Sequence, residues 1–176
     1  GSEMCIRDRT YADLPKDAAQ YKGYESTEKL KDKPPFANFI WDGSTITPQL
    51  ICSNLPTLTK QLEKSPKDLF LNICMGEYAR SGYHGLPYQL AEENDEQSFQ
   101  GKQFTRGEVY KNVIKTGTQG DLQAYALYRA IMCYSPSGIN DCADQEVTKN
   151  VRKQWYDQIK RDYPNSTWAK SLKYYW

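Results

Sequence analysis

The residues of this chain that could do chemistry are few and scattered. His84 is the only histidine among the 176 residues, so a Ser-His-Asp or Cys-His site would have to use it. It stands in a stretch that contains Gly85 and Pro87, and it has no recognisable nucleophile elbow beside it. We therefore interpret His84 as a loop residue, and retain it as a candidate for a binding surface rather than for catalysis.

Glu77 is the weak candidate for a general acid. It follows Gly76 in an apolar segment, and a carboxyl group in apolar surroundings can donate a proton, as in glycan-cleaving enzymes. A second carboxylate would come from Asp95 or Glu96. The simpler interpretation is a solvated helix residue that pairs with Arg80, three positions later. The sequence therefore predicts that the protein is not an enzyme, and a small secreted glycan-cleaving enzyme is the alternative.

Metal and cofactor motifs are weak. The acidic run 92–96 (EENDE) could offer oxygen ligands to Ca²⁺, but it lacks the alternating D-x-D-x-D-G spacing of a calcium loop. The cysteines form no C-x-x-C pair, which argues against zinc. We expect a solvated loop at 92–96, no metal and no cofactor.

The start of the chain looks unnatural. Gly1-Ser2 is typical of a cloning scar, and the EMCIRDR stretch that follows resembles a translated sequencing adapter. We treat residues 1–10, with Cys5, as tag and artefact, so that any signal peptide would be missing. Residues 11–45 show no sustained periodicity and are expected to form an extended arm. Residues 46–176 are expected to form a helical domain, which would then be the C-terminal part of a longer protein.

Four cysteines remain in the expected domain, and four allow three pairings. We favour Cys52–Cys74, because two antiparallel helices that fold about Ser65 would bring their Cα atoms within about 7 Å. We also favour Cys133–Cys142, which would close a short loop behind a buried helix. The alternative is four buried free thiols in a cytosolic protein. With both disulfides formed, the chain is expected to be periplasmic or secreted.

Helical signals dominate the domain, and they predict an all-α fold of about six helices in three hairpins. Thr47-Pro48 would start the first helix, Ser65 would cap the second, and Thr105 with Glu108 forms a capping box for the third. The segment from Asp121 is apolar nearly all round and should lie at the centre. The expected helices cover 47–62, 66–82, 105–117, 121–134, 144–162 and 166–176.

The chain ends in an aromatic segment. Trp168, Leu172, Tyr175 and Trp176 would share the inward face of the last helix, and we expect Trp176 to pack against the helix that carries Trp155. Aromatic residues off that face are more exposed in this interpretation. They are Tyr156 and Tyr174, which we take as candidates for a binding surface.

The last hairpin, WYDQIKRDYPNSTWAKSLKYYW, resembles the tetratricopeptide-like repeats of bacterial outer-membrane assembly lipoproteins and related periplasmic coordinator proteins. The positions that match are Tyr163, Pro164, Ser166, Ala169, Tyr174 and Trp176. The match covers about one repeat, and the long stretch 82–104 departs from the repeat pattern. The resemblance implies right-handed stacking of hairpins, an extracytoplasmic location, binding of other proteins and no catalytic residue.

Composition excludes some partners. The formal net charge is +1, which gives no general electrostatic reason to expect nucleic acid or an anionic membrane as a partner. No run approaches the roughly 18–20 apolar residues of a membrane span. We therefore expect a non-enzymatic protein-interaction or scaffold module of the bacterial cell envelope, which binds another protein or peptide. A structural C-terminal cap of a longer repeat protein is a further alternative, and the oligomeric state is left open.

Overall fold

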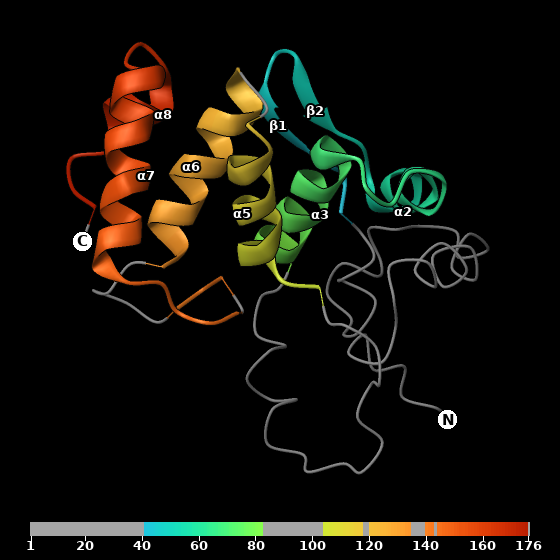
Figure 1. Ribbon diagram of the computed structural model, residues 1–176. Coiled ribbons are helices and arrows are strands. Elements are labelled where there is room, and N and C mark those ends of the chain that lie inside the picture. The colour runs from blue at the N-terminus through green and yellow to red at the C-terminus, as the bar shows by residue number, and fades with distance from the viewer. Residues whose placement is uncertain (1–40, 83–103, 118–119, 135–139, 143, 176) are drawn as a thin grey trace, which may run out of the picture. The chain divides into compact units, whose positions relative to one another are not determined.

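The computed structural model describes residues 41–82, 104–117, 120–134, 140–142 and 144–175 (Figure 1). These residues form six helices and one two-stranded sheet. They belong to two compact units, one that ends at Phe104 and one that begins at Thr105. The chain is mainly helical, as predicted, but it also contains a strand pair that the all-α prediction lacked.

The first unit opens with a β-hairpin where the sequence had predicted the start of a helix. Strands β1 (Ser44–Thr47) and β2 (Leu50–Cys52) pair in antiparallel fashion. The Thr47 Oγ1 atom accepts hydrogen bonds from the backbone N–H groups of Gln49, at 3.3 Å, and Leu50, at 3.1 Å. Thr47 therefore closes a turn instead of capping a helix, and the β-branched residues before it favour the extended backbone of a strand.

Helix α2 (Leu55–Lys64) follows the hairpin. The Asn54 side chain caps it by accepting a hydrogen bond from the backbone N–H of Thr57 at 3.1 Å, and Pro56 stands in the first turn, where no N–H is needed. The leucines predicted to form its apolar face are all fully buried: Leu55, Leu58 and Leu62. Helix α2 therefore begins later than predicted but presents the predicted face.

Helix α3 (Leu69–Gly82) completes the first hairpin with a four-residue turn after α2. The predicted cap was wrong, because Ser65 ends α2 by donating its backbone N–H to the Gln61 carbonyl at 2.9 Å. Asp68 takes the capping position instead, and its Oδ1 atom accepts the N–H of Leu71 at 2.9 Å. The two helices pack against each other as the predicted hairpin.

The core of the first unit lies between α2, α3 and the β-hairpin. Cys52 and Cys74 are at disulfide distance, with 5.3 Å between their Cα atoms, which confirms the predicted pair. The position of Cys52 on a strand was not predicted, since the argument had placed both cysteines on facing helices. Trp41 packs edge-on against Tyr78 with ring centroids 5.9 Å apart. The two cysteines share one buried cluster with Leu55, Leu58, Leu62, Met75 and Tyr78.

The second unit contains four helices: α5 (Arg106–Thr116), α6 (Asp121–Cys133), α7 (Lys149–Asp162) and α8 (Thr167–Ser171). Helix α6 lies between α5 and α7 and also packs against α8 (Figure 1). Its predicted central position in this unit follows from its composition, because a helix that is apolar on most sides needs neighbours on most sides.

Helix α5 has the ends that the sequence predicted. The Thr105 Oγ1 atom accepts the backbone N–H of Glu108 at 3.4 Å, and Gly117 ends the helix in the left-handed conformation with φ +67°.

The buried Gln123 of α6 connects three segments of the second unit by hydrogen bonds. It donates to the Ile114 carbonyl at 3.2 Å and accepts from the Tyr163 hydroxyl at 2.5 Å.

Helix α7 begins five residues later than predicted. Thr148 is its cap and accepts the backbone N–H of Val151 at 3.4 Å. Asp144, where the helix was expected to start, instead uses its carboxylate to bind the side chains of Tyr134 and Lys111.

Helix α8 begins as predicted but ends early. The Ser166 Oγ atom accepts the N–H of Ala169 at 3.1 Å, whereas Leu172 is already extended, with φ −77° and ψ 112°. The predicted helical stripe through Tyr175 is therefore wrong, because residues 172–175 are not helical. The predicted packing of Trp176 lies outside the described residues.

Candidate interaction surface

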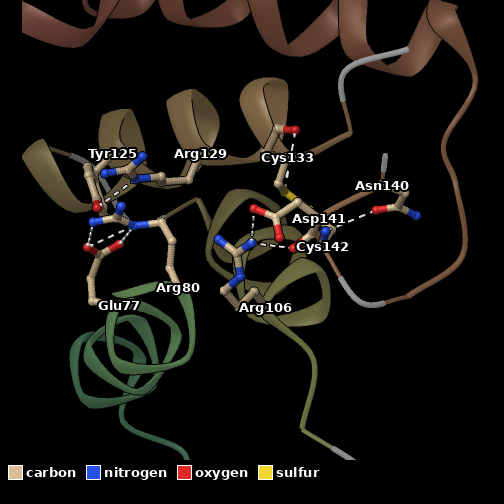
Figure 2. Close-up of polar contacts among 10 residues, drawn as sticks. Glu77, Arg80, Arg106, Tyr125, Arg129, Cys133, Asn140, Asp141 and Cys142 are labelled. Atoms are coloured by element: carbon tan, nitrogen blue, oxygen red, sulfur yellow. Dashed lines mark hydrogen bonds and ion pairs between the residues drawn. A yellow bond between two sulfur atoms is a disulfide. The ribbon is translucent and has the colours of Figure 1, made fainter. Parts of the chain in front are cut away.

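Glu77 lies buried in α3, with 1% of its surface exposed. Arg80 donates to it through Nη2 at 2.7 Å and through Nε at 3.3 and 3.4 Å (Figure 2). The predicted i,i+3 pair is confirmed, but the expectation of a solvated glutamate is wrong. The residues before it on α3, Ile73 to Met75, are buried as well, so this stretch of the helix lies in the core.

The environment of Glu77 bears on the enzyme alternative. A retaining or inverting glycan-cleaving enzyme needs a second carboxyl group opposite its general acid, whereas a described partner of the Glu77 carboxylate is the Arg80 guanidinium at 2.7 Å. The proposed second carboxylates, Asp95 and Glu96, lie outside the described residues. The same holds for His84 and for the acidic run 92–96. The glycan-cleaving alternative therefore stays a prediction.

The second cysteine pair closes a loop onto the ends of two helices. Cys133 and Cys142 are at disulfide distance, with 5.1 Å between their Cα atoms, as predicted. Asp141 donates its backbone N–H to the Cys133 carbonyl at 2.9 Å, and Gly107 donates to the Cys142 carbonyl at 3.0 Å. The buried Arg106 binds the Asp141 carboxylate at 2.6 Å and also its carbonyl (Figure 2). The loop is thereby fastened to the start of α5 and the end of α6.

A second polar group in this region surrounds Asp144. Its carboxylate accepts hydrogen bonds from the Tyr134 hydroxyl and from Lys111 Nζ, the latter at 2.8 Å. Burial, and then the neighbouring carboxylate of Asp144, raise the pKa of Tyr134 well above its ordinary value of 10.0. A Cβ atom on Gly107 would lie 1.9 Å from this hydroxyl and 2.3 Å from Asp144 Oδ1, so a larger residue there would displace these side chains. No sequence motif marks this cluster, because its members come from three separate segments.

Arg152 is a second buried cation of this unit, with 2% of its surface exposed. Its Nη2 atom donates to the Ile131 carbonyl at 2.8 Å, while Nε and Nη1 have no hydrogen-bond partner among the described residues. Burial lowers the pKa of this guanidinium below its ordinary value. A cation at the carboxyl end of α6 interacts favourably with the helix dipole. The spacing of 152 with the buried Trp155 and Ile159 would have signalled its burial.

The outward side of α7 carries an aromatic and basic stripe. Positions 149, 153, 156 and 160 recur every three or four residues and therefore share one side of the helix. The extended segment 172–175 runs along it. Lys160 Nζ donates to the carbonyls of Ala169, at 2.6 Å, and Leu172, at 2.7 Å. The Tyr156 hydroxyl donates to the Lys173 carbonyl at 3.2 Å.

Ring contacts continue this arrangement. The rings of Tyr156 and Tyr175 lie 5.6 Å apart, and Lys149 Nζ lies 5.9 Å from the centre of the Tyr175 ring. Leu172 contacts Lys160, Lys173 contacts Tyr156, and Tyr175 contacts Tyr156 and Lys149. Later residues of the segment therefore contact earlier residues of α7. The segment 172–175 is therefore antiparallel to α7.

The two elements together present what we call the tyrosine–lysine face. Tyr174 is 60% exposed, and Tyr156 is half-buried because it carries the ring contact with Tyr175. Lys153 is about half-exposed and pairs with Asp157 at 2.5 Å. The face is defined by Lys149, Lys153, Tyr156, Lys173, Tyr174 and Tyr175.

Lys160 should hold the segment 172–175 in place. We expect Lys160→Met to lower the free energy of unfolding by about 1–2 kcal/mol, because two charge-assisted hydrogen bonds to half-buried carbonyls are lost. Tryptic cleavage after Lys173, followed by mass spectrometry, should become several-fold faster. Lys153→Met is the matched control on the same stripe. It removes only an exposed ion pair and should change stability by less than about 0.5 kcal/mol. Equal effects of the two variants would show that the carbonyl contacts do not hold the segment.

Two searches within the described residues bear on other kinds of site. None of the helices there is long and apolar enough to cross a membrane. Those residues also contain no group of three or more His, Cys, Asp or Glu side chains placed to hold a metal ion. Comparisons of the chain with protein-family models, with curated proteins and with solved structures gave no match.

Proposed function

We propose that this chain is a non-enzymatic protein-interaction module of the bacterial cell envelope, and that it binds its partner through the tyrosine–lysine face. The observation that carries the proposal is the exposure of Tyr174 on a surface that the chain holds in place with several contacts. Tyrosine is enriched at binding surfaces because its ring buries a large area while its hydroxyl stays hydrated.

The two cysteine pairs support the compartment in this proposal. Disulfides form and persist in the periplasm and outside the cell, and are rare in the cytosol. Both pairs are at disulfide distance, and each lies in the packed part of its own unit. The periplasmic or secreted location remains part of the proposal. The cysteine variants described in the Discussion test whether the bonds form.

The helix pairs also support an interaction role. Helices α2 and α3 form one hairpin, and α5 and α6 form another. Paired helices of this kind bury one side and leave the other for contacts, as in the tetratricopeptide-like repeats that the last hairpin resembles. A partner bound on α7 and the segment 172–175 would use such an outward side.

A peptide selection tests the proposed function. The oxidised 176-residue chain is immobilised and presented with a displayed library of random 12-residue peptides. The face variant, Lys173→Gln with Tyr174→Ser, changes two exposed side chains and should keep the fold. The matched control, Lys115→Gln with Met132→Ser, changes an exposed lysine and an exposed apolar residue of α5 and α6.

The expected result is enrichment of peptides that bind the unchanged chain at least about tenfold more tightly than the face variant, with affinity for the control variant unchanged. Circular dichroism and thermal melting would verify that both variants are folded. The proposed function would be contradicted if the selected peptides bound the face variant as tightly as the unchanged chain. It would also be contradicted if no peptide were enriched.

A further inference from the structure

The charge of this chain is unevenly distributed along the sequence. Residues 149–176 contain seven lysines and arginines and two aspartates, whereas residues 1–148 contain sixteen basic and twenty acidic residues. The formal net charge of +1 is therefore the sum of a basic stretch, 149–176, and an acidic stretch, 1–148. That basic stretch includes both elements of the tyrosine–lysine face.

Several basic side chains of this stretch are occupied by internal contacts. Arg152 is buried, Lys160 binds two carbonyls, and Arg161 pairs with the adjacent Asp162 at 2.7 Å. Lys170 and Lys173 are different. Both are exposed, and neither pairs with a carboxylate within the part of the chain that the structure describes.

The exposed part of the face combines this charge with an aromatic surface. Lys173 directly precedes Tyr174, and Lys149 lies along the neighbouring stripe of α7, where Lys153 is already paired with Asp157. A carboxylate can accept hydrogen bonds from the lysine ammonium groups, while an apolar side chain beside it covers the tyrosine ring. Such a partner has acidic and apolar residues close together in one short segment.

The arrangement of the rings argues for a peptide rather than a nucleic acid. Single-stranded nucleic acid is held by a series of aromatic rings on which successive bases stack. In the tyrosine–lysine face, Tyr156 and Tyr175 pack against each other. Among the described tyrosines of the face, Tyr174 is the one classed as exposed. One exposed ring with nearby lysines suits a single apolar side chain flanked by carboxylates.

We infer that the tyrosine–lysine face binds an acidic peptide segment of the partner protein, one in which carboxylates flank an apolar or aromatic residue. The inference rests on the proposed function and names the partner's chemistry at the same surface. Its test is separate from the library selection, because the test uses defined peptides.

The test compares two labelled peptides that differ only in charge, (Glu-Phe-Glu-Ser)3 and (Gln-Phe-Gln-Ser)3. Fluorescence anisotropy measures their binding to the oxidised 176-residue chain at about 20 and 200 mM salt. We expect the acidic peptide to bind about tenfold more tightly at low salt, a difference of about 1.4 kcal/mol. The advantage should shrink several-fold at high salt, because exposed charges are screened beyond roughly 10 Å. The face variant should lose it, and the Lys115→Gln, Met132→Ser control should keep it.

Each other outcome overturns a defined part of the inference. Equal affinity for the two peptides overturns the acidic preference and leaves the proposed function standing. Undiminished binding to the face variant overturns the location. Tighter binding of a 12-nucleotide single strand of DNA than of the acidic peptide overturns the choice of a peptide partner. If neither peptide binds, the inference is wrong, and the library selection decides separately whether the face binds any peptide.

Discussion

Replacing Cys52 and Cys74 together by alanine should lower the free energy of unfolding of the first unit by about 3 kcal/mol under oxidising conditions. The two residues are 22 positions apart, so the bond restricts a sizeable loop of the unfolded chain. The pair also stands at the centre of the first unit's core, between α3 and the β-hairpin. Hydrogen exchange followed by mass spectrometry would resolve the effect on this unit, with Cys5→Ser in every variant to exclude wrong pairing.

The other cysteine pair is the matched control. Replacing Cys133 and Cys142 by alanine removes the same atoms but opens a loop of only nine positions. Because this loop is shorter, its opening should lower the free energy of unfolding by about 0.8 kcal/mol less than the loss of the Cys52–Cys74 pair does. The effect should be confined to the second unit. Unchanged stability of the parent chain on adding a reductant would contradict both expectations. It would favour the alternative of four buried thiols in a cytosolic protein.

Gly43→Ala should destabilise the first unit by about 3 kcal/mol. Gly43 has φ +98°, a left-handed conformation that costs an L-residue about 1–2 kcal/mol. A Cβ atom there would also lie 2.2 Å from the backbone carbonyl oxygen of Cys52, and a backbone atom of a paired strand cannot move aside as a side chain can. Urea unfolding monitored by circular dichroism would measure the loss.

Gly120→Ala separates the two contributions to that loss. Gly120 has a similar φ of +95°, with ψ −160°, but no atom of the described residues lies within 4 Å of the position that its Cβ would take. Its replacement should therefore cost only the conformational part, about 1–3 kcal/mol, and less than Gly43→Ala. If the two variants lose equal stability, the close approach of Gly43 to the strand contributes nothing. The expected difference would then be wrong.

Part of the surface could be anticipated from single residues. Tyr174 was predicted to be exposed because it falls off the apolar stripe of its segment, and it is 60% exposed. Tyr156 was predicted to be exposed for the same reason but is half-buried, because Tyr175 packs on its ring. The burial of Tyr156 could not be predicted without the path of residues 172–175 after α8 ends. Lys160 of a different helix contacts the start of that segment, and no local pattern reveals this contact.

The cysteine pairs show how a correct prediction can rest on an incomplete reason. Cys52 and Cys74 were paired because two helices would face each other, yet Cys52 lies on β2. The pairing holds because the chain reverses direction after Lys64, whichever element carries Cys52. The four-residue turn at 65–68 brings α3 back beside the segment that precedes α2.

Local chemistry in the sequence determined where most helices lie and which sides they bury. Capping by Thr105 and Ser166, the stop at Gly117 and the buried leucines of α2 all depend on residues within one turn of each other. Interactions of that range can be read along the chain because the backbone itself brings the partners together.

The tertiary structure alone decided the features that join distant segments. The burial of Glu77 and Arg152, the Asp144 cluster and the antiparallel course of 172–175 on α7 each join residues whose meeting depends on how whole helices pack. Packing is set by the sum of many weak contacts over entire faces, so no short motif encodes it. For this reason the sequence could indicate tyrosines on a surface, while the face that they form with the lysines appeared only in the folded chain.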